Sequence, residues 1–158
     1  MKLLQCLLYV ALIGVASHFI GLAMPREWFD PDSSLFRRRH WEENGELYRR
    51  LNIRAWKNKL PDTSKVVKTM YTKQVSTHPD ETNLQRMIQE TCVAEFIHLL
   101  LIVLSLGVTR IWKGKNGWIC WILCILGNLP FILIQRFNRP RLRSALERIR
   151  AKKVAPQN

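Results

Sequence analysis

Three long apolar segments constrain the fold of this chain more than any other feature of its 158 residues. They cover residues 3–24, 96–108 and 117–135. The hydrocarbon core of a bilayer is about 30 Å thick, and a helix crosses it with roughly 20 residues. The second segment reaches that length only if it is extended towards the N-terminus through His98 and Glu95. The sequence therefore predicts an all-α integral membrane protein with three transmembrane helices.

These segments divide the single expected domain into five parts. Transmembrane helices are expected over residues 1–24, 93–112 and 117–135, and a cytoplasmic interfacial subdomain over residues 25–92. Residues 136–158 are expected to form a basic, amphipathic cytoplasmic tail. The first segment could instead be a cleaved secretory signal, but its apolar run exceeds the roughly 7–15 residues typical of such signals. We therefore expect an uncleaved anchor.

Amphipathic patterns predict interfacial helices outside the three spans. Trp41, Tyr48 and Leu51 share one helical face, which is typical of a helix that lies in the membrane interface. The tail is expected to begin with a turn at Pro140 and to continue as a basic amphipathic helix, which by default attaches to a membrane surface. The apolar stripe of this helix comprises Leu142, Ala145, Leu146 and Ile149.

Other residues predict where helices begin, end or bend. Residues 77–80 combine a capping threonine with an early proline, which predicts one helix from about His78 to Arg110. Pro61 predicts the end of the preceding helix, because proline disfavours helical backbone at the residue before it. Pro130 removes a backbone hydrogen-bond donor and therefore predicts a kink in the third span.

The distribution of basic residues predicts the orientation. Of the 25 lysines and arginines, 13 lie in residues 26–90 and 8 lie in residues 136–153. By the positive-inside rule, both regions face the cytoplasm and the N-terminus lies outside. The net charge of +13 thus indicates topology and contact with anionic lipids. We expect no nucleic-acid partner, because the chain contains no recognisable nucleic-acid module.

No pattern for a metal or cofactor is present. The four cysteines form no Cys-x-x-Cys pair, so neither zinc nor a redox dithiol is indicated. Glu95 and His98 match half of a di-iron carboxylate site, but such a site needs two of these pairs and two further glutamates. We therefore expect neither a metal nor a bound cofactor.

The second span carries the strongest candidate for catalysis. Thr91, Glu95 and His98 fall on one helical face, at the end of an otherwise apolar stripe. Ionisable groups inside a bilayer are costly, so they usually face a bundle interior and serve a function. Because Glu95 and His98 are three residues apart, the carboxylate could orient the imidazole as a general base for a hydroxyl. The alternative is a buried pair that only holds helices together.

Polar residues after the second span could complete a binding site. Asn128 and Gln135 share a face of the third span, where they could hydrogen-bond across the bundle or contact a ligand. Basic residues near the cytoplasmic headgroups would suit the phosphates of an acyl donor or of lipids. Common acyl-transfer signatures, such as the nucleophile elbow around a serine, are absent.

A series of short motifs lies between residues 42 and 142. They are Glu42, Gly45, Tyr48, Arg54-Ala55-Trp56-Lys57, Leu60-Pro61, Met87-Ile88, Glu90-Thr91, Ala94-Glu95, His98, Asn128-Leu129-Pro130 and the run from Gln135 to Leu142. In order and spacing, they resemble the glycosyl-4,4'-diaponeurosporenoate acyltransferase family. The resemblance implies an enzyme of the bacterial plasma membrane. Such an enzyme esterifies a sugar hydroxyl of a glycosylated carotenoid with a fatty acyl chain, finishing a staphyloxanthin-type pigment.

We therefore predict a membrane acyltransferase that moves a fatty acyl chain from a thioester to a hydroxyl of a glycolipid or glycosylated isoprenoid. His98 is expected to be the general base, and Glu95 is expected to orient it. The donor would be an acyl-coenzyme A or an acyl-carrier thioester, and the chain could form a homo-oligomer. The predicted substrate-binding residues are Thr91, Trp56, Lys57, Asn128, Gln135, Arg136, Asn138, Arg139 and Arg141.

Two other functions fit the same sequence. The chain could be a non-enzymatic membrane scaffold or partner subunit, in which Glu95 and His98 serve only packing. It could also line a polar transport path, although three spans per chain would then require oligomerisation. An acylated glycolipid that disappears in a His98→Ala protein of normal abundance would distinguish catalysis from scaffolding.

Overall fold

The computed structural model describes residues 1–57 and 80–154. Two sequence predictions, the helix end at Pro61 and the helix start at His78, fall on residues outside these ranges. The helices are α1 (Lys2–Ala23), η1 (Arg26–Trp28), η2 (His40–Gly45), α2 (Glu46–Arg50), α3 (Ile53–Trp56), α5 (Glu81–Ser105), α6 (Val108–Ile111) and α7 (Lys115–Val154). No strand occurs in the described ranges, which confirms the all-α class.

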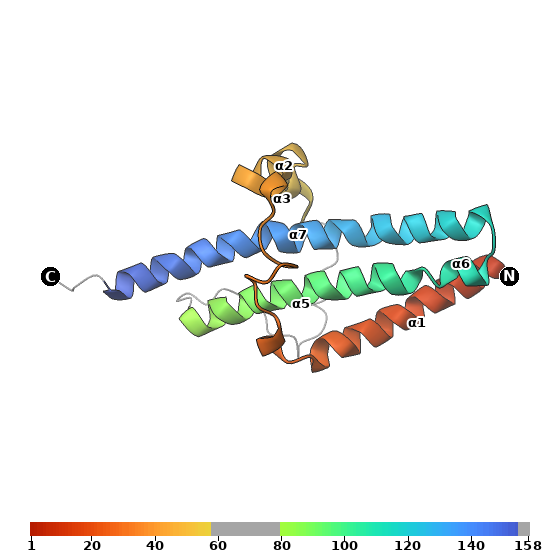
Figure 1. The fold of residues 1–158 in the computed structure, drawn as a ribbon, viewed down its shortest axis with the longest axis horizontal. Coiled ribbons are helices and arrows are strands. Elements are labelled where there is room, and N and C mark those ends of the chain that lie inside the picture. Colours follow the sequence, from red (N-terminus) through yellow and green to blue (C-terminus); the bar gives the residue numbers. More distant parts are fainter. Residues whose placement is uncertain (58–79, 155–158) are drawn as a thin grey trace.

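Three long helices lie side by side and determine the shape of the molecule (Figure 1). The middle helix, α5, packs against α1 on one side and α7 on the other, and it runs antiparallel to both. Each of the three is long and apolar enough to cross a membrane. By length and composition, this confirms the prediction of three transmembrane helices.

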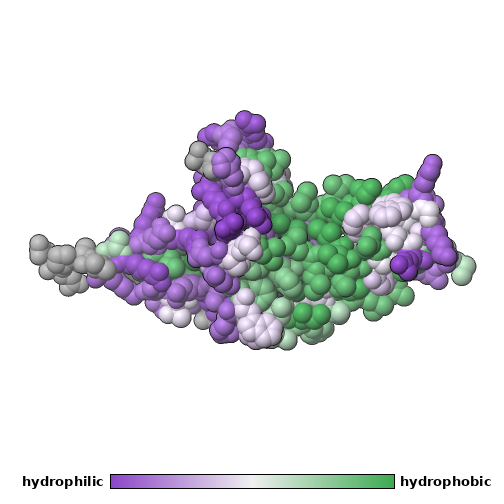
Figure 2. Space-filling view, viewed as in Figure 1, coloured by the Kyte–Doolittle hydropathy of each residue, from purple (hydrophilic) through white to green (hydrophobic). Residues whose placement is uncertain are grey.

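The apolar surface of the bundle is concentrated in one half. Figure 2 shows hydrophobic side chains over the half nearer to the N-terminus, and mainly hydrophilic ones over the half that contains the C-terminus. Large apolar side chains are exposed in the first half, which is typical of a surface that contacts lipid. They include Leu3, Leu8, Leu12 and Phe19 of α1 and Ile119, Leu123 and Leu126 of α7. The apolar half is thus the part suited to the bilayer.

Helix α7 is longer than the predicted third span, because it continues into the predicted tail. Its 40 residues rise by about 60 Å, roughly twice the thickness of a hydrocarbon core. Pro130 and Pro140 both lie inside the helix, so the turn expected at Pro140 is absent. The predicted boundary at residue 136 does not separate two elements either. The polar half of α7 is a rigid extension of the span.

The apolar stripe of the tail packs against α5. Leu142 and Leu146 of α7 pack with Leu84 and Ile88 of α5. Helix α5 begins at Glu81, before the span predicted from residue 93, and extends alongside α7 through the polar half. The apolar side chains of the predicted tail are therefore covered by α5, and attachment of the tail to a membrane surface stays a prediction.

Helix α5 ends earlier than predicted, next to a close contact with α1. The helix that was expected to reach Arg110 stops at Ser105, and α6 follows as a separate short helix. The Tyr9 hydroxyl donates a hydrogen bond to the carbonyl of Leu104 at 2.8 Å. A Cβ atom at Gly107 would overlap this hydroxyl, so glycine allows the close approach of α1.

Between α1 and α5, the chain crosses the bundle and forms a small helical cap. Residues 29–39, here called the crossing segment, pass over α5 and α7 to reach η2, α2 and α3 beyond α7 (Figure 1). Phe29 and Phe36 of the segment pack with Cys92 and Val93 of α5. The crossing segment is therefore held against the helices that carry the candidate site.

Shorter helices replace the single interfacial helix that was predicted in the cap. Asn52 has a left-handed backbone, with φ of 47°, and separates α2 from α3. Trp41 and Leu51 are 57% and 42% exposed, whereas Tyr48 is buried, so the three do not form one face. Tyr48 instead packs against Phe137 of α7, with ring centroids 5.7 Å apart.

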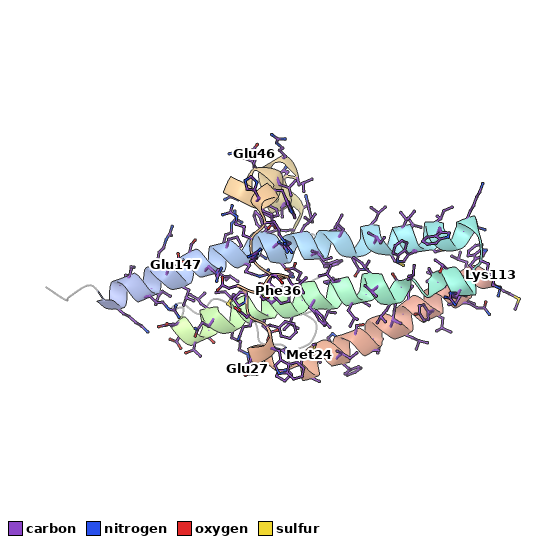
Figure 3. All side chains as sticks on the ribbon, viewed as in Figure 1. Met24, Glu27, Phe36, Glu46, Lys113 and Glu147 are labelled. Atoms are coloured by element: carbon purple, nitrogen blue, oxygen red, sulfur yellow. The ribbon has the colours of Figure 1, made fainter. Side chains whose placement is uncertain are left out.

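The two ends of the bundle allow a test of the predicted orientation. The N-terminus and Lys113 lie at one end, and Glu147 lies towards the other (Figure 1 and Figure 3). We expect Lys115→Cys to react with an impermeant thiol reagent in intact cells, and Ser34→Cys and Lys152→Cys to react only after permeabilisation. The parent protein, with its four cysteines, supplies the background. Labelling of Ser34→Cys from outside would overturn the orientation.

Candidate active site

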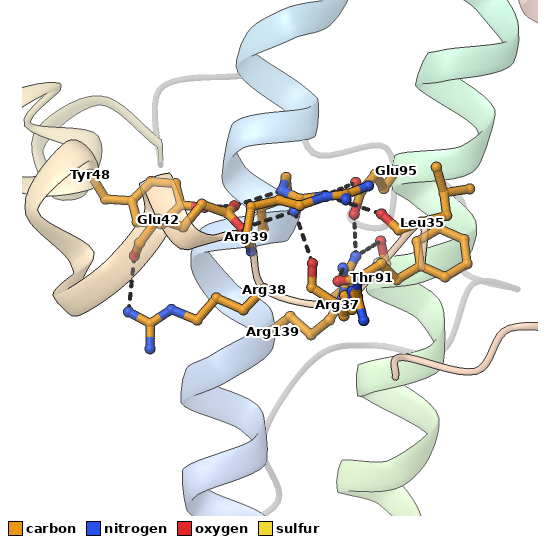
Figure 4. Close-up of polar contacts among 11 residues, drawn as sticks. Leu35, Arg37, Arg38, Arg39, Glu42, Tyr48, Thr91, Glu95 and Arg139 are labelled. Carbon is orange, nitrogen blue, oxygen red and sulfur yellow. Dashed lines mark hydrogen bonds and ion pairs between the residues drawn. The ribbon is translucent and has the colours of Figure 1, made fainter. Parts of the chain in front are cut away.

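Four charged side chains form a buried and electrically neutral network between the cap, α5 and α7 (Figure 4). Arg136 donates hydrogen bonds to Glu42 at 2.6 Å and 2.8 Å, and to one oxygen of Glu95 at 2.6 Å. Arg139 donates to the other oxygen of Glu95 at 2.5 Å. The two glutamates are only 2% and 1% exposed. Each buried carboxylate is thus matched by a guanidinium group, as buried charges require.

The same two arginines hold the crossing segment in place. Arg136 donates to the backbone carbonyls of Leu35 and Arg37 at 3.3 Å and 3.2 Å. Arg139 donates to the carbonyl of Phe36 at 2.7 Å. A guanidinium group has five N–H donors in a rigid plane, so it can serve carboxylates and carbonyls at once. The network therefore fixes the path of the crossing segment as well as the contact between α5 and α7.

Glu42 is held in its charged form. Burial alone would raise the pKa of Glu42, but hydrogen bonds from Arg136, from the Arg39 amide and from the Tyr48 hydroxyl lower it below its usual range. Burial and the adjacent carboxylate raise the pKa of the Tyr48 phenol, so this group remains a neutral donor. The cap is thereby tied to α7 through a charge-assisted chain of hydrogen bonds.

The network occupies three residues that were predicted to bind substrate. Arg139 is 4% exposed and also donates to the side-chain oxygen and the carbonyl of Thr91, at 2.9 Å and 3.1 Å. Arg136 is likewise shared between two carboxylates and two carbonyls. Substrate contact would require these groups to leave buried partners. In the structure, Thr91, Arg136 and Arg139 thus belong to the buried network, and their predicted contact with substrate stays a prediction.

His98 lies one turn further along α5 and has other partners. Its Nδ1 lies 2.9 Å from Oδ1 of Asn128, and its ring stacks on Phe131 with centroids 4.7 Å apart. The amide nitrogen of Asn128 donates to the carbonyl of Cys124 at 2.8 Å, which directs the amide oxygen towards His98. Because an amide oxygen only accepts, Nδ1 of the neutral imidazole carries the hydrogen. The lone pair is then on Nε2, where it can accept a proton.

The predicted pair of Glu95 and His98 is replaced by two separate sets of contacts. Both oxygens of Glu95 accept hydrogen bonds from arginines, whereas His98 bonds to Asn128. The physical reason is that a guanidinium group neutralises a buried carboxylate, which a neutral imidazole cannot do. Asn128, and not Glu95, is therefore the residue that hydrogen-bonds to His98. The role of His98 as a base stays a prediction.

Gln135 is a buried polar residue whose amide oxygen is unsatisfied. It is 9% exposed, and its Oε1 has no hydrogen-bond partner in the described part of the chain. It shares a helical face with Asn128, two turns away, and precedes Arg136 of the network. Buried polar groups are nearly always hydrogen-bonded. An orphaned acceptor at this position favours the prediction that Gln135 contacts a ligand.

The remaining predicted binding residues gather where the cap meets α7. The Lys57 amine lies 3.4 Å from the side-chain oxygen of Asn138 and 5.2 Å from the centre of the Phe137 ring. The Arg141 guanidinium lies 3.6 Å from the same ring centre. Trp56 also packs into the cluster that contains Phe137. Residues 56–57 and 138–141 therefore meet at α7, with Phe137 as their shared contact.

Glu42 and Tyr48 belong to the site, although no role was predicted for either. Glu42 lies far from Arg136 in the sequence, so no local pattern connects them. The only local signal is that an acidic residue follows the basic run from Arg37 to Arg39. Charge runs of this kind are usually solvated surface, so the pattern alone could not indicate a buried network.

The fold and site define a small helical membrane protein with a charged network and an oriented imidazole between its spans. Residues 25–148 match the sequence profile of the glycosyl-4,4'-diaponeurosporenoate acyltransferase family. The chain therefore belongs to this family and is an acyltransferase.

Relatives of the same name occur in Staphylococcus aureus. The protein of strain MRSA252 is 28% identical over 144 residues, which cover 89% of this chain and 86% of the relative. That of strain Newman is 27% identical over 150 residues, which cover 93% and 89%. No solved structure matches the chain.

Proposed function

We propose that this chain transfers a fatty acyl group from a thioester to a sugar hydroxyl of a glycosylated isoprenoid or related glycolipid. The names of its relatives identify a glycosylated diaponeurosporenoate as the compound that those proteins acylate. The proposed location is the plasma membrane of a bacterium, with the N-terminus outside. The proposed surroundings include anionic lipids, which would contact exposed cations such as Lys152 of α7.

One observation carries this proposal: the hydrogen bond between His98 and Asn128 leaves Nε2 of the imidazole as a free base. A neutral imidazole suits proton abstraction from a hydroxyl near neutral pH. The amide oxygen of Asn128 remains an acceptor when the ring becomes charged, so it stabilises the imidazolium that proton transfer creates. His98 is thereby proposed as the catalytic base and Asn128 as the group that orients it.

The proposed reaction is a single acyl exchange. As the acceptor oxygen attacks the carbonyl carbon of the thioester, its proton moves to Nε2 of His98. The tetrahedral intermediate then collapses, the bond between carbon and sulfur breaks, and the thiolate takes the proton from the imidazolium. An ester and a free thiol result, and the base is regenerated. The unsatisfied Oε1 of Gln135 is proposed to accept a hydrogen bond from another hydroxyl of the sugar.

Both substrates can approach from the boundary between the apolar and polar halves. The apolar half suits acyl and isoprenoid chains, and the polar half suits a sugar and the anionic part of a donor (Figure 2). On the polar side, Trp56, Lys57, Asn138 and Arg141 are proposed to form the entrance for the donor. The buried network would hold the helices at this boundary without adding net charge to the site.

Lipid profiling of cells tests the proposal. Production of the chain in a bacterium that supplies a glycosylated carotenoid should yield a new species, heavier than the acceptor by one esterified fatty acyl group. Cells with the empty vector are the control. A chain that is abundant in the membrane but yields no new ester in this host would favour a non-enzymatic scaffold.

A further inference from the structure

Two cations contact one aromatic ring, and no carboxylate among the described residues pairs with either of them. Arg141 and Lys57 both contact the ring of Phe137, at 3.6 Å and 5.2 Å from its centre. Burial, and the nearby charges of Arg141 and Arg54, lower the pKa of Lys57. Among the described residues, no carboxylate forms an ion pair with any of the three. We call Arg54, Lys57 and Arg141 the cation cluster.

The cation cluster differs from the other basic residues of the polar half. Arg143 pairs with Asp32, and Arg150 pairs with Glu81 at 2.7 Å. In these two pairs, an acidic side chain neutralises the arginine. Like charges that are held together without such a partner create a strong positive potential, which attracts an anion.

On the basis of the proposed thioester donor, we propose that the cation cluster binds the phosphate of a pantetheine arm. The rigid fork of Arg141 and the compact ammonium of Lys57 are the groups that bind phosphate most often in proteins. Asn138 and Phe137 hold these cations in position, through the 3.4 Å contact of Lys57 and through stacking of Arg141. The phosphate would neutralise charge for which the described residues provide no acidic partner.

The rise of α7 between the cation cluster and the partners of His98 can be compared with the length of a pantetheine arm. Asn138 lies seven residues from Phe131, which stacks on His98, and ten residues from Asn128, which bonds to it. These separations correspond to about 10–15 Å of helix rise. The chain between the phosphate and the sulfur of pantetheine has about as many atoms as four to five extended residues, or roughly 15 Å. The cap that carries Lys57 lies beyond α7, whereas His98 lies on α5 (Figure 1), so the arm would have to pass across α7 as well as along it.

Equilibrium binding to the purified full chain tests this inference without requiring turnover. The probes are phosphopantetheine, coenzyme A and pantetheine, which lacks the phosphate. Lys57→Gln and Arg141→Gln should each weaken binding of phosphopantetheine by about tenfold or more, because each removes a charge-assisted contact. Arg148→Gln, which removes an exposed arginine elsewhere on α7, should leave binding unchanged. Pantetheine should bind weakly and equally to all four proteins.

The outcomes separate the possible sources of the phosphate. If coenzyme A binds no better than phosphopantetheine, the arm of an acyl-carrier thioester is enough for recognition. Much tighter binding of coenzyme A would identify acyl-coenzyme A as the donor. Either result supports the phosphate site. Equal binding of pantetheine and phosphopantetheine would overturn the phosphate site. So would variants that bind phosphopantetheine as the wild type does and differ from it only in binding to phosphatidylglycerol vesicles. Phosphate-dependent binding without acyl transfer by any of the proteins would leave the site standing and contradict the proposed function instead.

Discussion

Replacing His98 with alanine is expected to lower the rate of acyl transfer by about 10²–10⁴-fold, the usual cost of losing a general base. The protein should remain folded, since His98 contributes one hydrogen bond and one stacking contact, to Asn128 and Phe131. The measurement is ester formation by the purified protein at saturating donor. The melting temperature in detergent controls for folding.

A second variant separates the base from the group that orients it. Asn128→Leu removes the acceptor for Nδ1 but keeps the imidazole, so we expect a smaller loss of activity than in His98→Ala. The pH at which activity falls on the acidic side should also change, because the imidazolium loses its acceptor. Full activity in a well-folded His98→Ala protein would contradict the assigned base and leave only the family membership intact.

Replacing Glu95 with glutamine is expected to destabilise the protein strongly. The carboxylate balances Arg136 and Arg139 at 2.6 Å and 2.5 Å, and an amide would neutralise neither and would turn an N–H group towards one of them. Breaking a buried ion pair by removing one partner costs about 3–5 kcal/mol. For a chain of this length, that corresponds to a melting temperature lowered by roughly 6–20 °C. Thermal unfolding in detergent measures the change.

A nearby glutamate offers a matched control for this prediction. Glu90 lies on the same helix and pairs with Arg26 at 2.8 Å, but the side chains of that pair are 21% and 16% exposed. Glu90→Gln should therefore lower the melting temperature much less than Glu95→Gln, because water can still reach the remaining charge. Equal effects of the two variants would argue against a special role of the buried network. A Glu95→Gln protein of normal stability that has lost activity would restore Glu95 as a catalytic candidate.

The three spans could be predicted because hydropathy acts locally. A helix that faces lipid must expose apolar side chains along its whole length, as α1 does with Leu8, Leu12 and Phe19, and a sequence window detects this directly. The face that joins Thr91, Glu95 and His98 was predictable for the same reason, since helical periodicity fixes which side chains point together.

The partners of these side chains were not predictable from local patterns. Glu95 was paired with His98 because the two are neighbours on one helix, but arginines from α7 carry the charge that a buried carboxylate needs. The amphipathic stripe around Leu146 has the same sequence pattern for contact with a membrane surface as for contact with another helix. In the structure, α5 covers it. In both cases, tertiary contacts between distant residues decided between arrangements that the sequence pattern allowed equally.

Acyl transfer by the purified chain is the most direct test of the account. The protein in lipid nanodiscs would receive a defined acyl thioester and a glycosylated carotenoid acid, and the ester and the free thiol would both be quantified by mass spectrometry. We predict that the acceptor gains one esterified acyl chain and that free thiol is released in equal amount. His98→Ala should lower the amounts of both products to the same extent. Thiol release without ester, or no reaction by the folded wild-type protein with these substrates, would contradict the account.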